Sequence, residues 1–166
     1  MSRAIVGVMG AGLATPQDCE LAYQLGSAIA EHDWVLLTGG RKAGVMDAAS
    51  LGAKANHGLV VGILPNDSAS AMSDAVDIPI VTDMGNARNN INVLSSNVIV
   101  ACGMGLGTAS EVALALKNHK PVILLNQTEL TQQFFASFTT ENLFYARTVE
   151  QAIVQIAEIL TKLKSL

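Results

Sequence analysis

The chain carries short runs in which nearly every residue is apolar, and segments with a helical spacing of apolar positions separate these runs. Such short apolar runs are typical of strands that are buried on both faces of a sheet. The pattern predicts strands at residues 4–9, 34–38, 59–64, 78–82, 98–102, 121–125 and 143–145. It predicts helices at residues 16–32, 45–56, 86–96, 108–117 and 148–164, and a short helix or excursion within residues 126–140.

The alternation of strands with helices determines the expected fold class. A helix between two strands is the usual connection between parallel neighbours, because parallel strands need a long crossover. We therefore expect an α/β fold, with a doubly wound, mostly parallel, Rossmann-like sheet and helices on both faces. No repeat or linker interrupts the pattern, so a single domain is expected over residues 1–166.

Three of the predicted strands run into glycine-rich loops. The loops contain Gly10 and Gly12, then Gly39 and Gly40, then Gly103, Gly105 and Gly107. In a parallel sheet, ligands bind at the carboxyl ends of the strands, where these loops lie. Glycine lets backbone N–H groups approach an anion, and a following helix presents unpaired donors and a positive partial charge. With Thr108 opening the helix after the third loop, this edge predicts a site for a small phosphorylated ligand.

Two familiar nucleotide motifs are missing from these loops. The segment Gly10-Ala11-Gly12-Leu13-Ala14-Thr15 lacks the third glycine of the dinucleotide fingerprint. The second strand ends in Thr38-Gly39-Gly40, where that fingerprint would place an acidic residue for the ribose. A Walker A loop with its Gly-Lys-Ser/Thr ending is also absent. The sequence therefore favours neither a nicotinamide-dependent dehydrogenase nor a P-loop enzyme.

The composition narrows the class of partners. Half of the residues are hydrophobic, 14% are charged and the net charge is −4, with no basic cluster larger than Arg41-Lys42. A nucleic-acid groove needs a basic stripe, so we expect no nucleic-acid partner. The low charge and the aromatic segment 134–138 favour self-association.

Residues 66–76 are rich in Ser, Asp and Ala without a clear period, which predicts a mobile loop or lid.

A few residue types indicate the expected cellular compartment and whether a metal site is expected. No apolar run approaches the roughly 20 residues of a membrane span, and the N-terminal residues lack the form of a signal peptide. Cys19 and Cys102 form no framework, so we expect reduced thiols in a cytoplasmic protein. The spacing of the three histidines suggests no metal site. Cys102 itself has two interpretations, a small buried residue or a thiol that faces the ligand.

Arg88 is the strongest candidate for a functional charge. It lies near the start of a predicted helix that contains several asparagines, which are poor helix formers and suggest a polar site. We expect Ala87, Ile91 and Leu94 to form the buried stripe of that helix. An arginine beside this stripe is suited to bind a phosphate through two hydrogen bonds. The alternative is a surface arginine paired with Asp83.

Glu111 also allows two interpretations. The segment Thr108-Ala109-Ser110-Glu111 fits a capping box, in which Thr108 and Glu111 satisfy each other's backbone amides. Alternatively, the carboxylate faces the sugar of a bound ligand and acts as an acid, a base or a hydrogen-bond acceptor. The spacing alone is compatible with both.

Several motifs, in this order along the chain, resemble a known superfamily. They are Gly39-Gly40, Gly44-Val45-Met46, Gly62-Ile63-Leu64-Pro65, Arg88, and Gly105-Leu106-Gly107-Thr108-Ala109-Ser110-Glu111. Together they resemble the LOG or lysine decarboxylase-like (SLOG) Rossmann proteins, whose signature is Pro-Gly-Gly-x-Gly-Thr-x-x-Glu. The enzymes of that superfamily are phosphoribohydrolases, which cleave the N-glycosidic bond of a nucleoside 5′-monophosphate. The resemblance implies catalytic positions for Arg88 and Glu111 if this chain is an enzyme.

Two departures point to another branch of the superfamily. Cys102-Gly103-Met104 stands where the signature has Pro-Gly-Gly, and Arg88 lies in a different local sequence from that of the enzymes. These features look more like the molybdenum cofactor carriers, which are homo-oligomers that hold a phosphorylated pterin and hand it on. The resemblance then implies contacts to the cofactor from Gly10, Gly12, Gly39, Gly40, Arg41, Arg88, Asn89, Gly103, Gly105, Gly107, Thr108 and Glu111.

Three functions follow from the resemblance. The first is the binding and carriage of the molybdenum cofactor (molybdopterin) by a dimer or tetramer that delivers it to molybdoenzymes or cofactor-synthesis proteins. The second is a LOG-type phosphoribohydrolase, and the third is a nucleotide-sensing module without turnover. None of the three requires a metal ion ligated by protein side chains.

Overall fold

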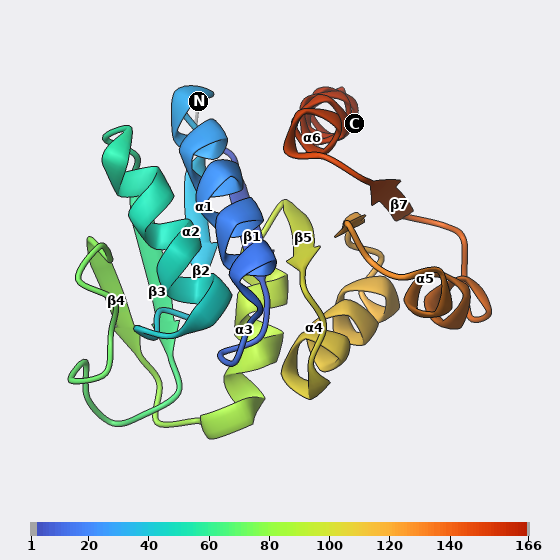
Figure 1. Ribbon diagram of the computed structural model, residues 1–166. Helices are drawn as coiled ribbons and strands as arrows, with labels where there is room; N and C mark the ends of the chain where they lie inside the picture. Colours follow the sequence, from blue (N-terminus) through green and yellow to red (C-terminus); the bar gives the residue numbers. More distant parts are fainter. Residues whose placement is uncertain (1–2, 166) are drawn as a thin grey trace.

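Seven strands form one parallel sheet in the computed structural model, which describes residues 3–165 (Figure 1). The strand order is β4-β3-β2-β1-β5-β6-β7, and all six neighbouring pairs are parallel. The strands are β1 (Ile5–Met9), β2 (Val35–Thr38), β3 (Val60–Leu64), β4 (Ile78–Val81), β5 (Val98–Cys102), β6 (Val122–Leu125) and β7 (Leu143–Ala146). Every strand that the apolar runs predicted is present, and the expected fold class is confirmed.

Six α-helices connect these strands. They are α1 (Pro16–Glu31), α2 (Gly44–Ala55), α3 (Arg88–Ser95), α4 (Leu106–Lys117), α5 (Glu129–Ala136) and α6 (Val149–Lys164), and a 3-10 turn η1 (Gly85–Ala87) precedes α3. Thr15, Thr128 and Thr148 cap α1, α5 and α6, because each hydroxyl accepts a hydrogen bond from a backbone N–H in the first turn. Among residues 3–165, no helix is both long enough and apolar enough to cross a membrane.

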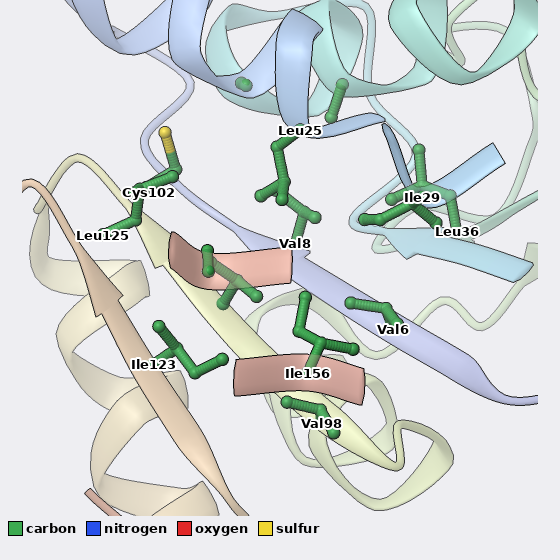
Figure 2. Packing of buried hydrophobic residues seen from close by; sticks show 14 of the residues in the cluster. Val6, Val8, Leu25, Ile29, Leu36, Val98, Cys102, Ile123, Leu125 and Ile156 are labelled. Carbon is green, nitrogen blue, oxygen red and sulfur yellow. The ribbon is translucent and has the colours of Figure 1, made fainter. Parts of the chain in front are cut away.

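The helices cover both faces of the sheet and bury a core on each. On one face, α1, α2 and α6 pack on alternate residues of the strands, and Figure 2 shows Leu25 of α1 and Ile156 of α6 beside Val6 and Val8 of β1. On the other face, α3, α4 and α5 pack on the intervening strand residues, including Ile99. The central strands are therefore apolar at consecutive positions, as the sequence pattern requires.

The strand order reverses direction between β1 and β5. From β1 the chain winds outward through β2, β3 and β4, and it then returns to place β5 on the other side of β1. The two loops that leave β1 and β5 therefore diverge to opposite faces of the sheet and open a crevice between them. Ligands of open α/β sheets bind at such a point, outside the carboxyl ends of the strands.

Two helix descriptions from the sequence need correction. Helix α4 begins at Leu106 and not at Thr108, with Gly105 as an extended N-cap residue. Helix α3 buries Arg88, Asn92 and Val93, whereas Leu94 is half exposed. The predicted stripe was wrong because α3 packs a polar face on α4. Hydrogen bonds between the two helices, described below, set the orientation of α3.

Helices α1 and α2 lie side by side (Figure 1) and approach closely through two glycines. A Cβ on Gly26 would overlap the carbonyl of Ala49, and one on Gly52 would overlap the carbonyl of Tyr23. Backbone atoms cannot move aside as a flexible side chain does, so an added methyl group must push the helices apart.

We expect Gly26→Ala to lower the free energy of unfolding by about 2 kcal/mol, which corresponds to a fall in Tm of about 4–8 °C. Thermal melting followed by circular dichroism measures this. Gly107→Ala is the matched control, because a Cβ there meets nothing within 4 Å. Equal melting temperatures for Gly26→Ala and the wild type would contradict the close packing.

Candidate functional site

A cavity of about 630 Å³ lies at the carboxyl ends of β1, β2 and β5, at the reversal of the strand order. All three glycine loops border it, together with the first turns of α2, α3 and α4. The lining includes most of the residues that the sequence singled out: Gly10, Gly12, Gly39, Arg41, Arg88, Asn89, Gly105, Gly107, Thr108 and Glu111. The chain thus brings together residues that lie up to a hundred positions apart.

The three loops interlock around the first one. The N–H of Val45 donates to the carbonyl of Ala11 at 3.1 Å, which joins the start of α2 to the first loop. On the other side, a Cβ on Gly105 would lie 3.3 Å from the Cβ of Ala11, so the third loop also contacts the first. The first loop is therefore held between the other two, and the edge of the cavity is continuous.

Gly40 and Gly103 shape the loops but do not line the cavity within the described chain. Both have a left-handed backbone, with φ of 74° and 69°, which glycine adopts without strain. The N–H of Gly40 donates to Thr38 Oγ1 at 3.0 Å, and its carbonyl accepts from the N–H of Ser73 at 2.9 Å. Gly40 and Gly103 therefore contribute to the site by setting the path of the backbone through the loops.

Residues 66–76 lie against the second glycine loop. The N–H of Lys42 donates to the carbonyl of Ala71, and Lys42 Nζ lies 2.5 Å from Asp74 Oδ2. An isolated antiparallel bridge joins Arg41 to Met72. These contacts hold the backbone of Arg41 beside the cavity, and a lid motion of this segment stays a prediction.

The helices that border the cavity begin differently from the others. In the described chain α2, α3 and α4 have no side-chain cap, with Ala43, Ala87 and Gly105 as their N-cap residues. Helices α1, α5 and α6 are each capped by a threonine. The first turns of α2 and α4 therefore present unpaired N–H groups and a positive partial charge, which together favour an anion. Helix α3 instead continues the 3-10 turn η1, and carbonyls of η1 accept the N–H of Arg88. The absence of caps is thus confined to helices that border the cavity.

Arg88 lies in the wall of this cavity and is 8% exposed. Its Nη1 donates to the carbonyl of Ile63 at 2.9 Å, and its Nε–H is buried without a partner in residues 3–165. The guanidinium covers Gly39, where a Cβ would overlap Nη1. Burial lowers the pKa of Arg88, as does the charge of Arg41, whereas Glu111 raises it. The alternative of a surface arginine paired with Asp83 is wrong, because α3 turns this side chain inward.

Glu111 is 7% exposed and belongs to the same cavity. Its Oε1 accepts a hydrogen bond from Asn92 Nδ2 at 2.8 Å, and one turn away Asn89 Nδ2 donates to Ser110 Oγ at 2.8 Å. The capping box is wrong, because α4 begins two residues earlier and Thr108 lies inside its first turn. Burial raises the pKa of Glu111, and the bond from Asn92 and the charge of Arg88 oppose this rise.

Arg88 and Glu111 face one cavity without forming an ion pair. Among the described residues, ion pairs join Arg3 to Asp33, Lys42 to Asp74 and Lys54 to Asp77. Arg88 is bound to a carbonyl of β3 and Glu111 to Asn92 of α3, so a separate partner fixes each charge. Both charges therefore stay available to a ligand placed between them.

Cys102 is a buried residue and not a thiol that faces the ligand. Figure 2 shows its side chain among apolar neighbours, and its Sγ–H donates to the carbonyl of Asp18 at 3.4 Å. Burial, with the nearby Asp18 and Cys19, raises the pKa of Cys102 to about 12. No group of three or more His, Cys, Asp or Glu residues in the described chain is arranged to hold a metal ion.

Several residues of the cavity were not predicted from the sequence as part of the site. Met9 and Met46 form part of its buried wall, Met104 is half buried, and Leu13 and Leu106 stand at its mouth. A signal for the two leucines was present, because each is a large apolar residue inside a glycine loop. The methionines gave no local signal, because their position depends on how the three loops pack.

Comparison with known proteins identifies relatives along most of the chain. The model of the SLOG cluster4 family matches residues 3–153. The solved structure of the molybdenum cofactor binding protein from Rippkaea orientalis is 58% identical, with a TM-score of 0.94, and the alignment covers 96% of this chain and 99% of that one. The molybdenum cofactor carrier protein from Chlamydomonas reinhardtii is 49% identical, with a TM-score of 0.92 and the same coverage.

A more distant similarity links the chain to enzymes. A cytokinin riboside 5′-monophosphate phosphoribohydrolase from Mycobacterium marinum is 32% identical over 100 residues, which are 58% of this chain and 53% of the enzyme. The chain therefore matches about half the length of that enzyme.

Proposed function

This chain belongs to the SLOG cluster4 family, and we propose from that premise that it binds the molybdenum cofactor and carries it for storage or transfer. The observation that carries the proposal is the anion site at the cavity. The uncapped N-termini of α2 and α4 border one space at the switch point of the sheet, together with Arg88. A phosphate monoester is the small dianion that such an arrangement favours.

The remaining features of the cavity support a cargo larger than phosphate. Its volume of about 630 Å³ is within the usual range for small-molecule sites. Arg41 at its rim, Asn86 in η1 and Asn89 in the first turn of α3 supply polar contacts to the rest of the cargo. Carriage also requires an acceptor, and we propose molybdoenzymes or cofactor-synthesis proteins in that role and a dimer or tetramer as the carrier.

A phosphoribohydrolase is the second candidate, because Arg88 and Glu111 face one cavity and the mycobacterial enzyme is a relative. In that function Arg88 anchors the phosphate, and Glu111 assists the attack of water at the anomeric carbon through an oxocarbenium-like transition state. The carrier is favoured because the carrier relatives are more similar and match over nearly the full chain.

One incubation separates the two candidates. The protein is mixed with cofactor released from a molybdoenzyme, or with AMP, and is then desalted. We expect bound molybdenum in the protein fraction and no free adenine, as measured by elemental analysis and liquid chromatography. An excess of inorganic phosphate is the control and should displace the cofactor. Release of adenine without retention of molybdenum would favour the enzyme and contradict the carrier.

A further inference from the structure

Two leucines at the mouth of the cavity are almost fully exposed. Leu13 is 99% exposed and Leu106 is 94% exposed, and both belong to the cavity lining. A single exposed leucine is ordinary on a protein surface. Here the two leucines come from different glycine loops, and those loops contact each other through Ala11 and Gly105. The pair is therefore a feature of the cavity mouth.

The wall near these leucines is apolar and polarisable. Met46 packs against Gly39 and is 6% exposed, and Met104 is half buried between Gly103 and Gly105. Thioether groups make favourable contacts with aromatic rings. Covering an aliphatic side chain with a ring is also favourable, because it removes apolar surface from water. The cavity thus has the charged side chains of Arg88 and Glu111 in its wall and the apolar side chains of Leu13 and Leu106 at its mouth.

We infer that Leu13 and Leu106 are specificity-determining residues that hold the planar ring of a phosphorylated heterocycle at the mouth of the cavity. This inference rests on the proposed function, because the phosphate site sets where the ring lies. Leu106 is the first residue of α4, whose first turn forms part of the phosphate site. A ligand anchored there places its next groups between the two leucines. The cavity therefore selects phosphate esters with a flat ring over plain sugar phosphates.

AMP and ribose 5-phosphate form a matched pair of probes, because AMP carries adenine where ribose 5-phosphate carries its anomeric hydroxyl group. We expect isothermal titration calorimetry to show AMP binding about tenfold more tightly than ribose 5-phosphate. Leu13→Ser and Leu106→Ser should each reduce this preference, and the double variant should bind the two probes with equal affinity. Leu130→Ser is the control, because Leu130 is 77% exposed on α5, away from the cavity.

Each outcome of this experiment has a distinct meaning. Equal affinities for the two probes, or AMP affinity unchanged in the double variant, would overturn the role of the leucines and leave the phosphate site in place. No binding of either probe to the wild type would overturn the phosphate site itself, and the role of the leucines with it. Loss of cofactor transfer to an acceptor enzyme with unchanged AMP affinity would instead assign the leucines to protein docking, against the inference.

Discussion

Replacement of Arg88 by alanine is expected to weaken the binding of AMP about 100-fold, because a buried guanidinium that contacts a phosphate contributes about 2–5 kcal/mol. Arg88 is fixed by its bond to the carbonyl of Ile63, so it meets the anion without first being ordered. Isothermal titration calorimetry at constant ionic strength measures the change.

Controls must separate the loss of a contact to the phosphate from a general change in the charge of the protein and from a loss of folding. Arg147→Ala is the matched control, because Arg147 is an exposed arginine that follows β7 at the same edge of the sheet and lies in a different cavity. Arg88→Lys keeps the charge but loses the planar pair of donors, and we expect an intermediate loss of about tenfold. If a folded Arg88→Ala variant binds AMP as the wild type does, Arg88 does not bind the phosphate.

The fold was predictable because its signals are local. A strand buried on both faces must be apolar at consecutive positions, and β1 and β5 meet this requirement. The start of α4 was missed because Gly105-Leu106-Gly107 resembles a loop, since glycine is a poor helix former. The first turn of α4 is exposed and borders the cavity, and there the geometry of the site outweighs the low helix propensity of glycine.

The site was predictable in part for the same reason. Glycines after strands are a local signal, and most of them line the cavity. The partner of Glu111 was not predictable, because Asn92 lies 19 residues away and meets it only through the packing of α3 on α4. The burial of Arg88 was missed for the same reason. Both the partner of Glu111 and the burial of Arg88 depend on contacts between elements that are distant in sequence.

The affinity for a dianion is expected to decrease as the pH rises, because of Glu111. Burial raises the pKa of its carboxyl group above the usual value, and a bound dianion in the same cavity raises it further. Binding therefore takes up a proton at pH values between the pKa of Glu111 in the free protein and its higher pKa in the complex. Between these two pKa values the affinity decreases by up to about tenfold per pH unit, and below and above them it is constant.

Sulfate is the appropriate probe, because its charge is constant from about pH 5 to about pH 9, whereas a phosphate monoester titrates near pH 6. The guanidinium of Arg88 keeps its charge over this range, and Asn92 does not titrate. Glu111→Gln preserves an acceptor for Asn92 and removes the charge, so its sulfate affinity should be independent of pH and should exceed that of the wild type at high pH. Glu150→Gln, at an exposed position in α6, should behave as the wild type. A wild-type affinity that is constant with pH would show that Glu111 does not sense the bound anion.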